Sequence, residues 1–296
     1  MSRRLVVTTA LLLVTVRVSA HGLQSVGGSA PGALSAWDIT AVAALVVSGL
    51  LYVRGTLIRV RRGATQRSRE IAAFGCGWSV LLVAMLPPID ALAIEQFAAH
   101  MLQHELMTLV AAPLIVAGRP LATMLWGLPD RLRGLVGRGL SAKKGGHVIA
   151  AASAPVVAWL VHGVVLWVWH APRLYDAAVA DESVHALEHA MFVASAALFW
   201  WGMLAGRYGR VGYGAAVFYV FTTVVHTGLL GAMLTLSPVP LYPTYVTAAR
   251  LHGFDALVDQ QLAGLLMWIP AGALLTALGL SLAAAWLGEA ERRQRL

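Results

Sequence analysis

Cysteine and charged residues are both scarce in this chain of 296 residues. Its single cysteine, Cys76, excludes an internal disulfide, a paired-cysteine redox motif and a metal site built from cysteine pairs. Charged residues make up 12% of the chain, whereas soluble domains carry about 25%. Any transition-metal site therefore has to use histidine, methionine or carboxylate ligands.

The hydrophobic residues, which are 58% of the chain, gather in blocks of about 20 residues, the length that crosses a bilayer as a helix. We find no internal repeat, no low-complexity segment and no second domain. This pattern predicts an all-α, polytopic membrane protein with a bundle of seven transmembrane helices. The blocks are 37–53, 71–90, 97–118, 148–169, 185–205, 213–236 and 262–287.

The first 20 residues are typical of a secretory signal peptide. They have a basic start, a short apolar core at 5–16 and small residues at 18–20, where cleavage is expected. An uncleaved first helix is the alternative, but the apolar run is short and Arg17 ends it. We divide the chain into a signal peptide 1–20, an extracytoplasmic lead-in 21–36, a membrane domain 37–287 and a cytoplasmic tail 288–296.

The basic residues, which give a net charge of +8, alternate between the connecting loops. The loops at 54–70 and 119–147 each hold six, the connection near 207–210 holds two, and the C-terminal tail holds three more. The loops between them contain only Arg173 and Arg250. The positive-inside rule then predicts a protein of the bacterial plasma membrane with its N-terminus outside and its C-terminus in the cytoplasm. Because the basic residues lie in loops that set the orientation of the protein in the lipid bilayer, the positive charge needs no other explanation. We therefore do not expect nucleic acid as a partner.

The ten histidines are distributed unevenly between the two sides of this topology. Only His147 falls on the cytoplasmic side, which predicts a histidine-lined vestibule that faces outward. Cleavage of the signal peptide would add a free N-terminal amine beside one of the outer histidines. The histidines on the outer side are His21, His100, His104, His162, His170, His185, His189, His226 and His252.

Two histidine pairs repeat the same spacing. His100 with His104, and His185 with His189, are each four residues apart, so each pair lies on one face of a helix. Imidazole suits copper, zinc, iron and nickel, and ionisable groups inside a membrane are functional suspects by default. The alternative is that each histidine only bonds a neighbouring carbonyl. The predicted metal ligands are His100, His104, His185 and His189, followed by His170, His162 and His226.

Other polar and sulfur-containing residues lie near these histidines in the sequence. Carboxylates and amides can orient metal-binding histidines, or attract an incoming cation, although those at helix ends can also be merely solvated. Thioethers favour Cu(I), with gap-filling packing as the alternative. The predicted supporting residues are Glu188, Asp90, Gln103 and Asp259, and the possible soft ligands are Met101 and Met233.

Five groups of motifs in the chain together resemble one known family. The motifs are His100-Met-Leu-Gln-His104 with Pro113 and Gly118-Arg-Pro, Trp169-His-Ala-Pro-Arg-Leu-Tyr-Asp176, His185-Ala-Leu-Glu-His189, Gly231-Ala-Met-Leu-Thr235 with Pro240-Leu-Tyr-Pro243, and Asp259-Gln-Gln-Leu-Ala-Gly264 with Met267-Trp268. Through them the chain is similar, over about 37–287, to the CtaG-like assembly factors of cytochrome caa-type (heme–copper) oxidases, which have a seven-helix membrane core. Glu105 departs from the resemblance, because an apolar residue is expected there.

The resemblance implies a non-enzymatic role in making the copper centre of a cytochrome c oxidase. We expect copper as the bound metal, an extracytoplasmic copper donor, and the catalytic subunit of the heme–copper oxidase as the acceptor. A cysteine-free site of imidazoles fits transient storage, because neutral ligands can capture copper and still release it.

Three other interpretations remain open from the sequence. His185-Ala-Leu-Glu188-His189 also matches H-x-x-E-H, in which two histidines bind zinc and the glutamate activates water. That match favours an intramembrane zinc metallohydrolase. Paired histidines could also bind heme, and a transporter is the third alternative.

Overall fold

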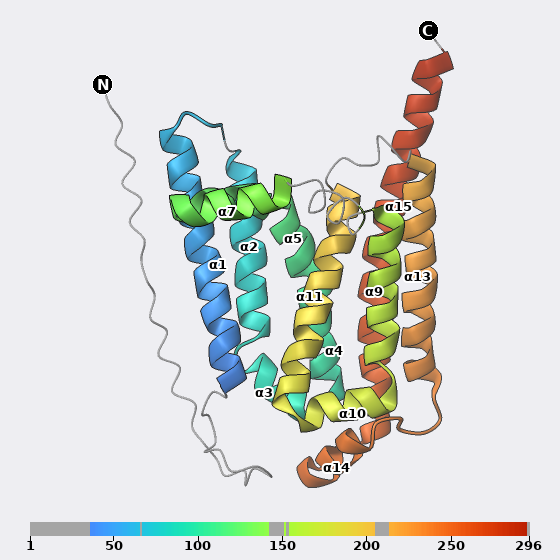
Figure 1. The fold of residues 1–296 in the computed structure, drawn as a ribbon. Helices are drawn as coiled ribbons and strands as arrows, with labels where there is room; N and C mark the ends of the chain where they lie inside the picture. The colour runs from blue at the N-terminus through green and yellow to red at the C-terminus, as the bar shows by residue number, and fades with distance from the viewer. Residues whose placement is uncertain (1–35, 66, 142–150, 152–153, 205–212, 295–296) are drawn as a thin grey trace, which may run out of the picture.

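The computed structural model describes residues 36–65, 67–141, 151, 154–204 and 213–294, and all regular secondary structure in these ranges is helical (Figure 1). The expected signal peptide, the lead-in as far as residue 35, and His21 and His147 lie outside the described residues. The expected tail at 288–296 continues the last helix as far as Gln294.

Within the described ranges, five helical stretches are long and apolar enough to cross a membrane, and two bent helix pairs bring the number to seven if each pair is one span. Large apolar side chains such as Leu50 and Phe221 lie exposed on the outside of the bundle, as expected for a surface that faces lipid. The prediction of an all-α, multi-pass membrane protein is confirmed. The unbroken stretches are α1 (Ala36–Arg61), Phe97–Ala117, α11 (Glu182–Leu204), α13 (Tyr213–Leu236) and α15 (Ala256–Gln294).

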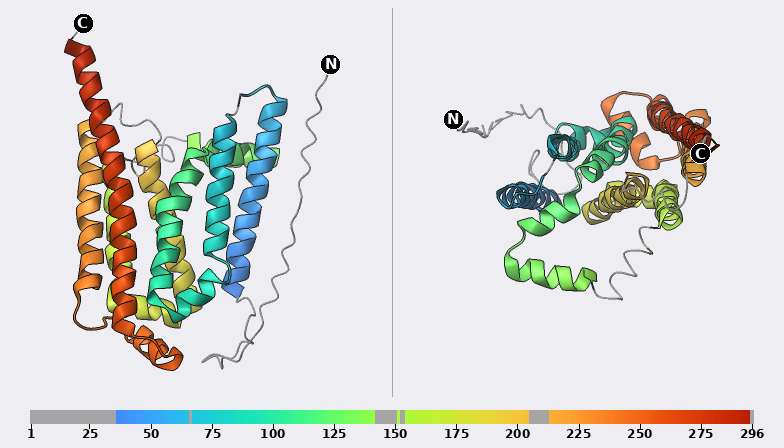
Figure 2. Two further views of the ribbon diagram at one scale, coloured as in Figure 1. Left: turned by 180° about the vertical axis from the view of Figure 1, so that it is seen from behind. Right: turned by 90° about the horizontal axis from the view of Figure 1, so that it is seen from above.

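Both bent pairs turn at the same end of the bundle. The helices α2 (Ser68–Ala84) and α3 (Ile89–Glu95) meet at 43°. The helices α9 (Pro155–Trp169) and α10 (Pro172–Ala180) meet at 75°. Together with α14, the short helices α3 and α10 cover this end, whereas the C-terminal part of α15 extends beyond the opposite end (Figures 1 and 2).

The stretch Phe97–Ala117 is not one regular helix. It consists of α4 (Phe97–Glu105), a π-helical turn η1 (Leu106–Ala111) and α5 (Ala112–Ala117). In the π turn the amide of Ala112 bonds the carbonyl of Met107, five residues back. The next amide in that pattern belongs to Pro113, which has no N–H to give, so the Thr108 carbonyl accepts a 2.9 Å hydrogen bond from the Trp200 indole instead. This bond ties α11 to the irregular turn.

Several segments that the sequence suggested as loops are helical. The helices α6 (Pro120–Gly127) and α7 (Asp130–Ser141) occupy most of the basic loop after α5. The outer loop before α15 contains α14 (Pro243–His252). Pro243 begins α14, a position where the missing proline N–H costs nothing.

Glycines let the longest helices approach each other closely. A Cβ at Gly264 of α15 would lie 2.4 Å from the Thr235 hydroxyl oxygen and 2.6 Å from the Gly231 carbonyl oxygen of α13. The contact fixes α13 against α15, which also packs against α4. The chain thereby holds α4 between α15 on one side and α11 on the other.

Candidate metal centre

The two predicted histidine pairs meet inside the bundle, because α4 and α11 face each other. The ring centroids of His100 and His185 are 5.1 Å apart, those of His100 and His189 are 5.9 Å apart, and those of His104 and His189 are 5.4 Å apart. His100, His104 and His189 are at most 5% exposed, whereas His185 is partly exposed. The open side of the group is therefore at His185.

Glu188 lies between the histidines and is fully buried. Its carboxylate oxygens are 3.8 Å from His100 Nε2 and 3.9 Å from His104 Nε2, which is too long for hydrogen bonds. Two sets of three have potential ligand atoms within 4.8 Å of one another: His100 with His185 and His189, and His100 with His104 and Glu188. We call His100, His104, His185, Glu188 and His189 the histidine centre.

Many polar atoms of the histidine centre have no hydrogen-bond partner among the described residues. They include His100 Nε2, both ring nitrogens of His104, His189 Nε2 and both carboxylate oxygens of Glu188. Buried polar atoms are nearly always hydrogen-bonded, and several such atoms in one place would be costly. A metal ion with nitrogen and oxygen ligands would satisfy them, so the residues fit a first-row transition metal.

A tyrosine that the sequence analysis did not select determines the orientation of His100. The Tyr245 hydroxyl donates to the Ala93 carbonyl at 2.7 Å and lies 2.8 Å from His100 Nδ1. Since the hydroxyl proton is already used, we assign the proton of this bond to Nδ1, which donates to the tyrosine oxygen. His100 Nε2 is then left as a bare acceptor that faces the histidine centre, the form that binds a metal.

Asp259 supports the histidine centre indirectly, through the helix α4. Its two carboxylate oxygens accept hydrogen bonds from the backbone amides of Phe97 and Ala98, at 2.7 and 3.1 Å. These amides belong to the first turn of α4, where helical N–H groups have no partner within the helix. Asp259 therefore caps the helix that carries His100 and His104, and it does not orient a histidine ring as predicted.

Gln103 and Asp90 also have a structural role that differs from the prediction. The Gln103 amide donates to Asp90 at 2.9 Å and to the Ala84 carbonyl at 2.8 Å. These bonds connect α4 to the end of α2 and the start of α3. Gln103 and Asp90 thus link the helices through these bonds, and a supporting role toward the histidine rings stays a prediction.

The predicted ligand His170 lies beside the histidine centre. Its ring centroid is 6.4 Å from that of His104, and its Nδ1 is 2.6 Å from the Leu166 carbonyl oxygen. That oxygen can only accept, so Nδ1 carries the proton, and the buried Nε2 has no hydrogen-bond partner in the described chain. His170 can thus complete the set of ligands from α9.

The structure does not bring His162 and His226 into the histidine centre. His162 precedes His170 by eight residues on α9, about 12 Å along the helix axis at 1.5 Å per residue. Its Nδ1 lies 3.1 Å from the Ser195 hydroxyl of α11, and among the described residues neither His162 nor His226 belongs to a group of potential metal ligands with the histidine centre. Of the seven predicted ligands, these two therefore lie outside the histidine centre.

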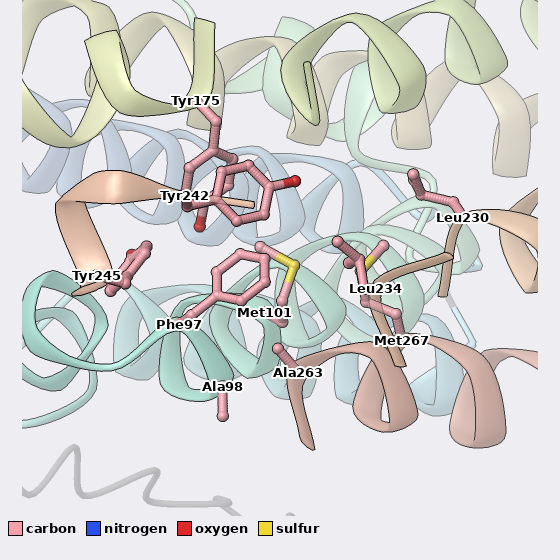
Figure 3. Packing of buried hydrophobic residues seen from close by; sticks show 10 residues of the cluster. All are labelled: Phe97, Ala98, Met101, Tyr175, Leu230, Leu234, Tyr242, Tyr245, Ala263 and Met267. Atoms are coloured by element: carbon pink, nitrogen blue, oxygen red, sulfur yellow. The ribbon is translucent and has the colours of Figure 1, made fainter. Parts of the chain in front are cut away.

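The two methionines predicted as soft ligands have other positions. Met101 is fully buried in an apolar cluster with Phe97 and Met267 (Figure 3). Met233 is half exposed on the outer surface of α13, away from the histidine centre. Packing thus explains Met101, and exposure to lipid explains Met233.

Aromatic side chains close the centre on the side of α10 and α14. Tyr175 lies with its ring centroid 5.2 Å from that of His100, and Tyr242 and Tyr245 pack near it (Figure 3). Burial raises the pKa of the Tyr242 and Tyr245 hydroxyls well above their usual value, so both stay neutral donors. Tyr175 and Tyr242 occur in the quoted motifs, but only the fold shows that α10 and α14 place them beside His100.

The family described as "Cytochrome c oxidase caa3 assembly factor (Caa3_CtaG)" matches residues 50–289, which include every residue of the histidine centre. No curated protein and no solved structure matches the chain.

Proposed function

The chain belongs to the cytochrome c oxidase caa3 assembly factor family, and we propose that it binds copper at the histidine centre and delivers it to the oxidase. The resemblance drawn from the sequence motifs thus agrees with the family match. Association with cytochrome oxidase and with the membrane follows from the family. The copper, the site and the direction of transfer are our proposal.

The observation that carries the proposal is the group of unsatisfied atoms in the histidine centre. Four imidazoles and one carboxylate converge from α4 and α11, and most of their ligand atoms have no partner in the described chain. Neutral imidazole nitrogens are good copper ligands. The chain has no cysteine pair that could form a closed thiolate cage, so the centre can release the metal to an acceptor.

We place the histidine centre at the extracytoplasmic side of the bacterial plasma membrane. It lies at the end covered by α3, α10 and α14 (Figure 1), whereas the basic residues of the α1–α2 connection and of α7 lie at the opposite end. The positive-inside rule assigns that basic end to the cytoplasm. The donor is then an extracytoplasmic copper protein, the acceptor is the catalytic subunit of the heme–copper oxidase, and the C-terminus is cytoplasmic.

Metal analysis of the purified protein tests the site. The copper content of the purified protein is expected to fall in the double variant His100→Ala, His104→Ala, which removes the ligands that α4 contributes. His252→Ala is a matched control, because His252 lies in α14 and pairs with Glu95 at 3.9 Å rather than with the histidine centre. Equal copper content in the double variant and the control would refute the site.

A deletion strain tests the role in assembly. We expect oxidase subunits to be present but deficient in copper, and the wild-type gene to restore the metal where the double variant does not. An oxidase that is fully active and replete with copper in the deletion strain would contradict the proposal.

A zinc metallohydrolase is the second candidate, because His100 supplies the third ligand that the H-x-x-E-H motif lacks. The variant Glu188→Gln separates the two functions. A hydrolase would lose turnover of its substrate and keep its metal, since the glutamate activates water. We propose that the protein is not an enzyme, and we expect Glu188→Gln to retain part of its capacity to support oxidase assembly.

Heme binding is less compatible with the packing around the rings. A porphyrin needs a flat slot between its axial histidines, but Phe192 packs 4.4 Å from the His104 ring and Tyr175 packs 5.2 Å from the His100 ring, between centroids. We therefore expect no Soret absorbance from the purified protein. A Soret band lost in His100→Ala would support heme instead.

A further inference from the structure

A second compartment, mostly apolar but with several polar lining residues, lies deeper in the bundle than the histidine centre. It is a small, partly open cavity of about 40 Å³, and we call it the inner cavity. The stretch α4–η1 and the helices α9, α11, α13 and α15 all contribute to its wall. Its polar and sulfur-containing lining residues are Glu105, Thr108, His162, Thr223, Thr227 and Met267.

His162 lines the inner cavity, and its hydrogen bond leaves one ring nitrogen as an acceptor. The Ser195 hydroxyl donates to the Phe192 carbonyl at 3.2 Å, so its oxygen accepts the bond from His162 Nδ1 at 3.1 Å. The proton of the imidazole is therefore on Nδ1, and Nε2 carries the lone pair. His162 is only 7% exposed. A hydrogen bond that fixes the far nitrogen of a buried imidazole is typical of metal-binding histidines.

The other lining groups complete a set of donors. Met267 supplies a thioether. Glu105 supplies a carboxylate whose Oε2 is buried and has no hydrogen-bond partner among the described residues. The hydroxyls of Thr223 and Thr227 donate to carbonyls of their own helix, at 2.7 and 2.8 Å, so their oxygens remain as acceptors. Each of these groups can thus offer a lone pair to a cation, whereas the Trp200 indole, which also lines the cavity, is a donor only and bonds the Thr108 carbonyl.

The inner cavity and the histidine centre are neighbours on two helices. Glu105 directly follows His104 at the end of α4. On α11, Ser195 follows His189 by six residues, about 9 Å at helical rise. The cavity therefore lies below the centre along the same helices, further into the membrane.

We propose that the inner cavity is a second copper-binding position, which holds Cu(I) through His162 Nε2 and the Met267 sulfur, with Glu105 as the balancing charge. Thioether together with imidazole selects Cu(I) over harder cations. A lone cation inside a bilayer is costly, and the carboxylate offsets that cost. The inference rests on the proposed copper function, and it makes the protein a two-position copper store.

Copper titration of the full-length protein in detergent tests this position. Under reducing conditions, with a competing Cu(I) chelator, the wild-type chain is expected to bind two Cu(I) ions, and both His162→Gln and Met267→Leu are expected to bind one. The two substitutions keep side-chain volume close to the original, so folding is expected to persist. Ser195→Ala should lower the affinity for the second Cu(I) ion about 10- to 100-fold, because it removes a hydrogen bond that orients a ligand.

Met101→Leu is the matched control, because Met101 is equally buried but does not line the inner cavity. It should retain both ions, and Zn(II) binding should be the same in Met267→Leu as in the wild type. The proposal is overturned if the wild-type chain binds one Cu(I), if His162→Gln and Met267→Leu both bind two, or if Met101→Leu loses as much as Met267→Leu.

The double variant His100→Ala, His104→Ala separates this inference from the proposed function. If it keeps one Cu(I), and that ion is lost on adding Met267→Leu, the inner position is supported independently of the histidine centre. If the double variant no longer supports metallation of the oxidase but still binds Cu(I) in the inner cavity, the result bears on the proposed function and leaves the inner position supported.

Discussion

The hydroxyl of Tyr245 offers the sharpest test of how the histidine centre is organised. The variant Tyr245→Phe keeps the ring, which packs with Phe97 and Tyr175, and removes two hydrogen bonds of 2.7 and 2.8 Å. His100 would then be free to rotate and to change tautomer. Losing a group that orients a metal ligand lowers metal affinity about 10- to 100-fold, which is about 1.4–2.7 kcal/mol in binding free energy.

The variant should also be less stable, because the Ala93 carbonyl loses its partner in a buried place. An unsatisfied buried group costs about 1–3 kcal/mol. Two assays therefore belong together: thermal unfolding in detergent without metal, and copper affinity measured against a competing chelator.

Tyr242→Phe is the matched control for this prediction. Its hydroxyl bonds the backbone carbonyl of His170 at 2.9 Å and not a ring nitrogen. We expect a similar loss of stability and a copper affinity within about threefold of the wild type, since no ligand tautomer depends on that bond. If Tyr245→Phe retains wild-type affinity, or if both variants lose affinity equally, the tautomer argument is wrong.

Three further predictions concern the framework of the bundle, and each is measured by thermal unfolding in detergent. Gly264→Ala should lower the free energy of unfolding by about 1–3 kcal/mol or more through overpacking, because its Cβ would lie 2.4 Å from an oxygen of α13. Gly272→Ala should be nearly neutral, because no atom lies within 4 Å of the new methyl group. Trp200→Phe should cost about 1–3 kcal/mol by leaving the Thr108 carbonyl without its donor; an unchanged unfolding temperature would refute the role given to this bond. Asp259→Ala should cost about 0.5–2 kcal/mol, the range for a lost helix cap, and should also weaken copper binding, because the capped helix carries two ligands; copper affinity equal to the wild type would refute that coupling.

The membrane fold and the meeting of the histidine pairs could be predicted from the sequence. Apolar blocks of bilayer length predict helices, and the spacing of four residues places His100 beside His104 and His185 beside His189 on single faces. The arrangement of α4 against α11 then brings the four rings together. These features depend on local periodicity, which a single sequence contains.

The supporting residues and the depth of His162 could not be predicted in the same way. Asp259 caps α4 across 161 and 162 positions of the chain, and Tyr245 reaches His100 across 145, so nothing in the local pattern signals either bond. The π turn at Leu106–Ala111 also changes the helical phase midway through the span. Proximity in sequence to a histidine suggested Gln103 as a supporting residue, but its amide points to α2 and α3.

Glu188 also determines which charge the histidine centre can hold. It contributes the one carboxylate among the five residues of the centre, beside four imidazoles that bind metal in their uncharged form. A monovalent ion with an ionised Glu188 makes the assembly electrically neutral, whereas a divalent ion leaves one net positive charge buried within the bundle. Because an uncompensated charge in a medium of low dielectric constant is strongly disfavoured, the single carboxylate favours a monovalent metal in the histidine centre.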